Sequence, residues 1–100
     1  LMMTGDPISS RAAMDMGMIY KVFSDESFEL ESWKLATKLS AMPTKALGLT
    51  KRLLNASYEN NFEEQINMED KCQTIAGNTA DFNEGISAFF EKRKPKFKGN

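Results

Sequence analysis

The sequence predicts a mainly α-helical fold with about five helices and one short strand. Apolar residues recur at spacings of three, four and seven along most of the 100 residues, as they do on one face of a helix. Serine, threonine, asparagine, proline and glycine interrupt this pattern in the positions typical of helix ends. Without internal repeats or a linker-like segment, residues 1–100 are predicted to form a single structural unit.

The first predicted helix follows a turn at residues 5–7, Gly-Asp-Pro. Ser9 or Ser10 offers its N-cap, and Gly17 ends it because glycine adopts left-handed dihedrals at little cost. Residues 18–23, Met-Ile-Tyr-Lys-Val-Phe, are short, β-branched and aromatic, which predicts a strand. A strand needs a partner, and the sequence offers no second one, so we expect that partner to lie outside these 100 residues.

Two further helices are predicted before residue 60. Residues 24–25, Ser-Asp, cap the first, and Glu26 lies in its first turn, where the helix dipole favours negative charge. Pro43 interrupts the pattern and is predicted to occupy the first position of the next helix, where a missing N–H costs nothing.

The last forty residues predict two more helices. Asn61 and Glu64 have the spacing of a capping box, and Gly77 ends that helix. The last helix begins after a cap at Thr79 and is predicted to hold residues 92–94, Lys-Arg-Lys, in its final turn. Its apolar stripe consists of Phe82, Ile86, Phe89 and Phe90. A chain of this size does not easily cover such a stripe, so we expect residues outside it or a second subunit to do so.

Charge is unevenly distributed. Residues 91–100 carry a net +4, whereas the other ninety carry eight basic and thirteen acidic side chains, a net −5. The basic tail suits a local anionic partner, and a solvated, salt-screened end is the alternative. No nucleic-acid partner is expected, because the tail makes few phosphate contacts and no aromatic stacking platform accompanies it. No membrane association is expected either, since no apolar run approaches the ~18 residues of a membrane span.

The sequence does not predict a self-contained active site or a metal site. It has no histidine, which removes the commonest general base and most zinc sites. The adjacent carboxylates at residues 63–64 and 69–70 point in different directions on a helix, so neither pair converges on one atom. Cys72, the only cysteine, excludes an internal disulfide and suits a reducing compartment, which predicts a cytoplasmic protein. We interpret it as a small hydrophobic residue.

The closing residues carry a resemblance to a known family. Residues 81–97 are similar to the pattern D-x-x-E-G-x-x-A-F-x-E-K-R-x-P-x-F at the end of enoyl-CoA hydratases and isomerases. Residues 1–19 and the later Pro43, Ala46 and Lys51 are similar to stretches that precede this pattern. The whole chain therefore resembles the C-terminal segment of the crotonase superfamily. Residues 76–77 and 79–82, together with residues 43–44, Pro-Thr, look most like its phenylacetate-pathway isomerase branch.

The resemblance implies the C-terminal helical layer of the crotonase fold, an α/β spiral, without its catalytic N-terminal part. It implies a parent enzyme of fatty-acid or phenylacetate metabolism, a hydratase (a lyase) or an isomerase. Such an enzyme acts on acyl-CoA thioesters through an enolate-like intermediate held in an oxyanion hole. The catalytic carboxylates of the family lie upstream, so no catalytic residue is expected here and this segment alone is expected to be inactive.

The resemblance also implies a trimer, or a dimer of trimers, and no cofactor beyond the coenzyme A of the substrate. Residues near the end of the chain are expected to approach the coenzyme A held by a neighbouring subunit, and Lys92, the lysine of the E-K-R motif, is the expected contact to its adenosine phosphate end. Gln73 lies where some relatives place an aromatic residue near the adenine, which leaves at most a hydrogen bond there. A stand-alone helical module that docks a partner protein through the phenylalanine stripe is the alternative function.

Overall fold

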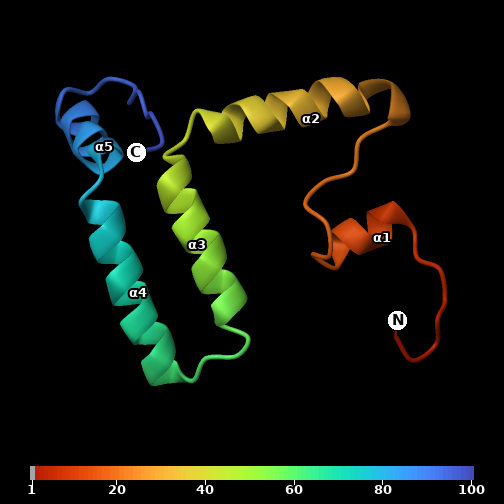
Figure 1. The fold of residues 1–100 in the computed structure, drawn as a ribbon. Coiled ribbons are helices and arrows are strands. Elements are labelled where there is room, and N and C mark those ends of the chain that lie inside the picture. Colours follow the sequence, from red (N-terminus) through yellow and green to blue (C-terminus); the bar gives the residue numbers. More distant parts are fainter. Residues whose placement is uncertain (1) are drawn as a thin grey trace. The chain divides into compact units, whose positions relative to one another are not determined.

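The computed structural model describes residues 2–100, and that part of the chain contains helices but no strand. The predicted mainly α-helical fold is confirmed. The five helices are α1 (Ser10–Asp15), α2 (Asp25–Ser40), α3 (Thr44–Ala56), α4 (Phe62–Gly77) and α5 (Ala80–Phe90), shown in Figure 1. Contacts divide the chain into two compact units, one that ends at Lys34 and one that comprises Leu35–Asn100. That residues 1–100 act as one domain stays a prediction.

Helix α1 begins and ends as its sequence predicts. The Ser9 hydroxyl accepts the Ala12 N–H at 3.1 Å and so satisfies one free donor of the first turn. At the other end Gly17 has a φ of 76°, and the N–H of Met18 reaches back to the Ala13 carbonyl at 2.9 Å. This is a Schellman ending, in which a left-handed glycine satisfies carbonyls of the last turn.

The strand predicted at residues 18–23 is wrong for this structure. Met18, Ile19 and Tyr20 form a bend, and the residues that follow lead into α2 without pairing with another segment. A strand is stabilised by hydrogen bonds to a neighbour, and no second strand exists among residues 2–100. The β-branched and aromatic composition of this run is therefore not sufficient to make it a strand within this chain.

Helices α3 and α4 form the framework of the second unit and lie side by side, joined by a short turn (Figure 1). The capping box at the start of α4 is confirmed: the Asn61 side chain accepts the Glu64 N–H, and the Glu64 carboxylate accepts the Asn61 N–H. The amide of Gln65 on α4 donates to the Leu53 carbonyl of α3 at 3.4 Å. Pro43 is the N-cap of α3 and not its first helical residue, one position away from the prediction.

Helix α5 is shorter than predicted. The Thr79 hydroxyl caps it by accepting the Phe82 N–H at 3.1 Å, as expected, but the helix ends at Phe90. The prediction that residues 92–94 lie in its last turn is wrong. Lys92 has a φ of 54°, so the backbone leaves the helix there, and the next residue, Arg93, donates its N–H to the Ala88 carbonyl at 3.0 Å. This is again a Schellman ending, with a lysine in the position that glycine usually takes.

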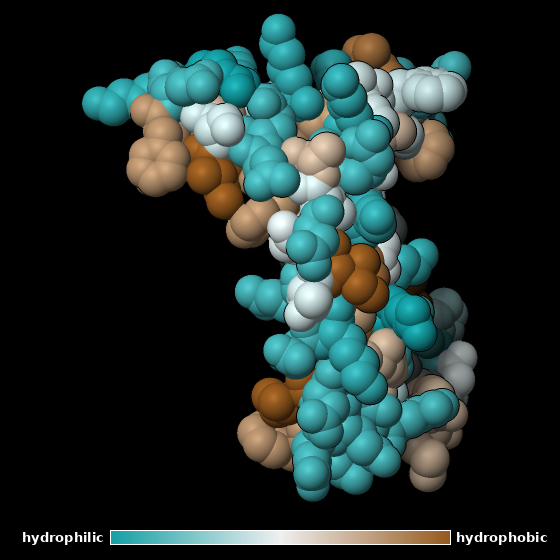
Figure 2. All heavy atoms as spheres, turned by 60° about the vertical axis from the view of Figure 1, so that its left-hand side comes forward, coloured by the Kyte–Doolittle hydropathy of each residue, from teal (hydrophilic) through white to brown (hydrophobic). Residues whose placement is uncertain are grey.

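Few side chains in the described residues are buried. Ala13, Cys72 and Ala88 are the buried hydrophobic ones, so the reading of Cys72 as a small core residue is confirmed. Phe89 and Phe90 of the predicted stripe are 80% and 78% exposed, and Figure 2 shows hydrophobic side chains in the open beside hydrophilic ones. Residues 2–100 therefore leave much of the stripe exposed, as expected.

Candidate functional site

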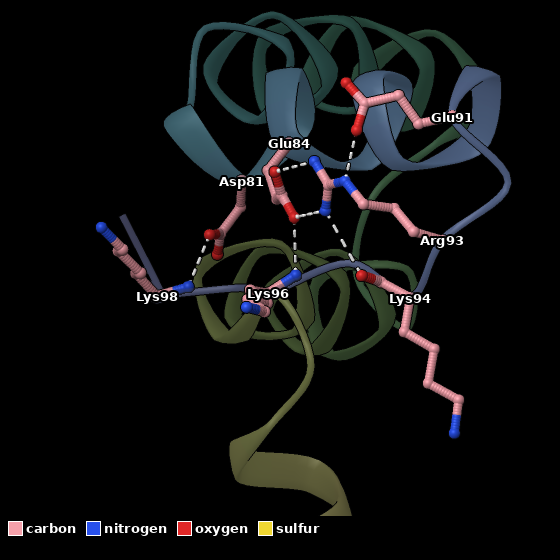
Figure 3. Close-up of polar contacts among 7 residues, drawn as sticks. All are labelled: Asp81, Glu84, Glu91, Arg93, Lys94, Lys96 and Lys98. Atoms are coloured by element: carbon pink, nitrogen blue, oxygen red, sulfur yellow. Dashed lines mark hydrogen bonds and ion pairs between the residues drawn. The ribbon is translucent and has the colours of Figure 1, made fainter.

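The last residues of the chain fold back along α5 and form what we call the C-terminal strap, residues 93–100 (Figure 3). Two carboxylates hold it. Asp81 and Glu84 are three residues apart on α5, so their side chains point from the same face of the helix. Asp81 is only 3% exposed. Its two oxygens accept the N–H groups of Lys98, at 2.6 Å, and Gly99, at 2.8 Å.

Glu84 anchors the strap at its other end. Its two oxygens accept both terminal nitrogens of Arg93, at 2.6 and 2.9 Å, in a bidentate ion pair. One of these oxygens also accepts the N–H of Lys96 at 2.7 Å. The third guanidinium nitrogen of Arg93, Nε, donates a hydrogen bond to the carboxylate of Glu91 (Figure 3).

The strap alternates between an inner and an outer side, as extended chains do. On the inner side, Phe97 lies so close to α5 that a Cβ added at Gly85 would be 3.7 Å from its ring. Gly99 has a φ of 80°, and a Cβ there would lie 2.5 Å from the Thr44 hydroxyl at the start of α3, so only glycine fits. The outer side carries three exposed lysines without an ion pair to any residue the structure describes: Lys94, Lys96 and Lys98.

Lys92 lies between the end of α5 and the strap. Its side chain is exposed, and within residues 2–100 it forms no hydrogen bond or ion pair. Its backbone is fixed on both sides, because its own N–H donates to Phe89 and the next N–H donates to Ala88. The ammonium group of Lys92 is thus available to an anion while its Cα position is held.

Gln73 lies in a different part of the second unit. It is exposed on α4 and lines a hollow of about 420 Å³ together with residues of α3, among them Leu49 and Leu53. Its amide has no hydrogen-bond partner in the described chain. Lys92 does not line this hollow, and no described hydrogen bond joins it to Gln73, so the structure does not bring the two predicted contacts together.

A second hollow of about 380 Å³ is apolar and lies on the stripe of α5. Phe82, Phe89 and Phe90 line it with Phe97 of the strap, and Ala46 of α3 closes one side. The stripe, the strap and the start of α3 therefore form one continuous apolar surface.

With this geometry in place, comparison with known proteins decides the family. A sequence profile described as enoyl-CoA hydratase/isomerase matches residues 1–100, the whole chain. The chain belongs to the enoyl-CoA hydratase/isomerase family. The predicted resemblance is confirmed, and the strap is the form that the closing motif of this family takes here.

Individual relatives agree with this assignment. The chain is 38% identical over 99 residues to 1,2-epoxyphenylacetyl-CoA isomerase of Escherichia coli, with 99% of this chain and 38% of that protein covered. It is 31% identical to 2,3-dehydroadipyl-CoA hydratase of the same organism, with 39% of that protein covered. The crystal structure of an enoyl-CoA hydratase from Polaromonas sp. JS666 superposes with a TM-score of 0.88 at 30% identity and covers 96% of this chain and 37% of its own. The chain thus spans less than two fifths of the length of these relatives.

The structure gives a role to family-motif residues that sequence reasoning left without one. The sequence alone predicts no contact for Asp81 or Glu84. Asp81 and Glu84 are three residues apart on one helix face, and an arginine follows nine residues after Glu84. This spacing is the sequence signal for carboxylates that hold the returning chain against the helix.

Among residues 2–100, no group of three or more histidine, cysteine, aspartate or glutamate side chains is arranged to hold a metal ion.

None of the helices in the described residues is both long enough and apolar enough to span a membrane.

The ion pair of the strap changes how Glu84 titrates. The guanidinium of Arg93, followed by the N–H of Lys96, lowers the pKa of Glu84 from 4.5 to about 2. The same pair, with Glu91, raises the pKa of Arg93 above its usual value. Glu84 therefore stays charged in the folded protein at pH values where it would accept a proton in the unfolded chain.

A pH dependence of stability follows from this shift. Because the pKa of Glu84 is lower when folded, its contribution to stability is complete above pH 4.5 and is lost as the pH falls towards about 2. We expect the difference in unfolding free energy between the wild type and Glu84→Gln to shrink over that range, as measured by urea unfolding at each pH. A difference that stays constant from pH 7 to pH 2 would show that the carboxylate is not paired in solution.

Proposed function

We propose that residues 1–100 are the C-terminal part of an enoyl-CoA hydratase or isomerase that acts on acyl-CoA thioesters through an enolate-like intermediate. The observation that carries this proposal is the match to the family profile along all 100 residues. Since the relatives are more than twice as long, we place the oxyanion hole and the catalytic carboxylates in the remaining length of the complete polypeptide. The similarity to 1,2-epoxyphenylacetyl-CoA isomerase favours a ring-derived acyl group and isomerase chemistry.

In this proposal Lys92 contacts a phosphate at the nucleotide end of the coenzyme A held by a neighbouring subunit. Three observations support it: the ammonium group is exposed, it has no described ion-pair partner, and the segment around it carries a net +4. Gln73, whose amide faces an open hollow without a described partner, contributes a hydrogen bond to the adenine. No cofactor other than the coenzyme A of the substrate is proposed.

We further propose that the complete enzyme is a cytoplasmic homo-oligomer, a trimer or a dimer of trimers. The support is the apolar surface formed by the α5 stripe and the strap: the three phenylalanines of the stripe are at least half exposed among residues 2–100, with Phe82 at 50%. Exposed apolar surface of this kind is typical of a face that another subunit or domain covers. The lone, buried Cys72 is consistent with a reducing compartment.

The test of the coenzyme A contact is Lys92→Ala in the complete polypeptide. We expect the KM for an acyl-CoA substrate such as crotonyl-CoA to rise about fivefold with little change in kcat, because one exposed charge-assisted contact is lost. Alanine is preferred to glycine here, since glycine would also relax the left-handed backbone at this position. Steady-state kinetics measure both constants.

Lys92→Arg is the matched control, and it should retain a KM near that of the wild type because it keeps the charge. An unchanged KM in Lys92→Ala would remove this residue from the binding site. Turnover of crotonyl-CoA by residues 1–100 alone would contradict the proposal that the catalytic groups lie elsewhere in the polypeptide.

A further inference from the structure

We propose that Glu84 is a positioning residue, which clasps the basic C-terminal strap to α5 and thereby presents Lys92 and the outer lysines of the strap to the phosphates of coenzyme A. This inference rests on the proposed function, and it adds to it a residue that does not itself touch the ligand.

Lys92 is fixed by the turn that follows α5. Lys92, the residue before the strap, leaves the helix with a φ of 54°. This conformation costs a non-glycine residue energy and needs support from its surroundings. That support comes from Arg93, whose N–H bonds the Ala88 carbonyl and whose guanidinium bonds both oxygens of Glu84. Without Glu84, the turn keeps the backbone bonds of the Schellman ending and the exposed pair of Arg93 with Glu91, but no other side chain among residues 2–100 then ties Arg93 to the face of α5 along which the strap lies.

The rest of the strap is held to α5 through its backbone. Residues 94–100 have no regular secondary structure, so their order depends on contacts with α5. Glu84 accepts the Lys96 N–H, and Asp81 accepts those of Lys98 and Gly99. All three bonds use backbone N–H groups and leave the ammonium groups free. Figure 3 shows the side chains of Lys94 and Lys98 pointing away from the two carboxylates.

A flexible basic tail must lose conformational freedom when it binds an anion, and that loss weakens binding. A strap that is already clasped to a helix has lost this freedom on folding. Glu84 therefore favours binding of phosphate by ordering the lysines in advance.

Glu84 is an anion close to a proposed phosphate site, so its charge alone opposes binding. Removing it should tighten binding of coenzyme A if charge dominates and weaken it if positioning dominates. Glu91 offers the matched control, because it pairs with the same Arg93 but bonds no backbone N–H of the strap.

The experiment measures the Kd of coenzyme A and of dephospho-coenzyme A for the complete polypeptide by titration calorimetry. For Glu84→Ala we expect the Kd of coenzyme A to rise roughly fivefold, with a much smaller change for dephospho-coenzyme A, which lacks one phosphate. Glu91→Ala should leave the Kd of coenzyme A unchanged or lower. Glu84→Asp, which restores a carboxylate, should recover part of the affinity.

The possible results separate the two proposals. Tighter or unchanged coenzyme A binding by Glu84→Ala, or an equal loss for both ligands, overturns the positioning role. If Glu84→Ala fails to fold, Glu84→Gln keeps the size of the side chain without its charge, and an unchanged Kd in that variant is equally decisive against it. A wild type that does not distinguish the two ligands overturns the phosphate contact and this inference together. A loss of affinity in Lys92→Ala but not in the Glu84 variants overturns this inference alone.

Discussion

Replacement of Asp81 by alanine is expected to release the end of the strap and to destabilise it by about 3 kcal/mol. Asp81 is 3% exposed and accepts two backbone N–H groups with its two oxygens. Hydrogen bonds to a charged group contribute more than neutral ones, and alanine leaves the donors of Lys98 and Gly99 without a partner in a partly buried position. Hydrogen exchange at these two amides measures the free energy of opening directly.

Asp81→Asn is the matched control for this change. Asparagine has the same shape but keeps only one acceptor oxygen, so one of the two strap amides loses its bond and a smaller effect is expected. The backbone N–H groups of Asn61 and Glu64 at the start of α4 serve as an internal reference for hydrogen exchange, because their capping box does not involve the strap. If the amides of residues 98 and 99 exchange as fast in the wild type as in Asp81→Ala, the clasp does not form in solution.

The helices were largely predictable because their ends are determined by local chemistry. Ser9, Asn61 and Thr79 cap α1, α4 and α5 through bonds that span three residues, so the information needed lies within one turn of each position. Residues 18–23 show the opposite case. Their composition favours a strand, but strand formation depends on a distant partner, and composition carries no information about that partner.

The strap was not predictable from local rules for the same reason. Lysine and arginine after a helix are favoured by its dipole, which suggests a longer α5. The structure instead ends α5 at Phe90, because Arg93 has a stronger partner in Glu84, nine residues earlier, than in the helix carbonyls. The positions of Lys92 and Gln73 as coenzyme A contacts came from family resemblance and stay predictions.

The largest effect on assembly is expected from Phe89→Ala. The Phe89 ring is 80% exposed and touches Phe90 edge-on, with ring centroids 5.8 Å apart. Within this chain, loss of the Phe89 ring should change the unfolding free energy by no more than about 0.5–1 kcal/mol. If another subunit covers the apolar surface of α5 and the strap, the same change should weaken assembly by about 3–5 kcal/mol, because a buried phenylalanine is then replaced by a cavity. Analytical ultracentrifugation of the complete polypeptide measures the association constant.

Phe62→Ala is the control that tests whether the effect of Phe89→Ala on assembly is specific to the stripe. Phe62, at the start of α4, is 83% exposed but lines neither hollow, so Phe62→Ala removes the same side chain from a surface of similar exposure. We expect it to leave association unchanged. Equal effects of the two substitutions would mean that exposure alone, and not the continuous surface of α5 and the strap, decides where subunits meet. An assembly that is unaffected by Phe89→Ala would place the subunit contact on another face and leave the apolar hollow to some other partner.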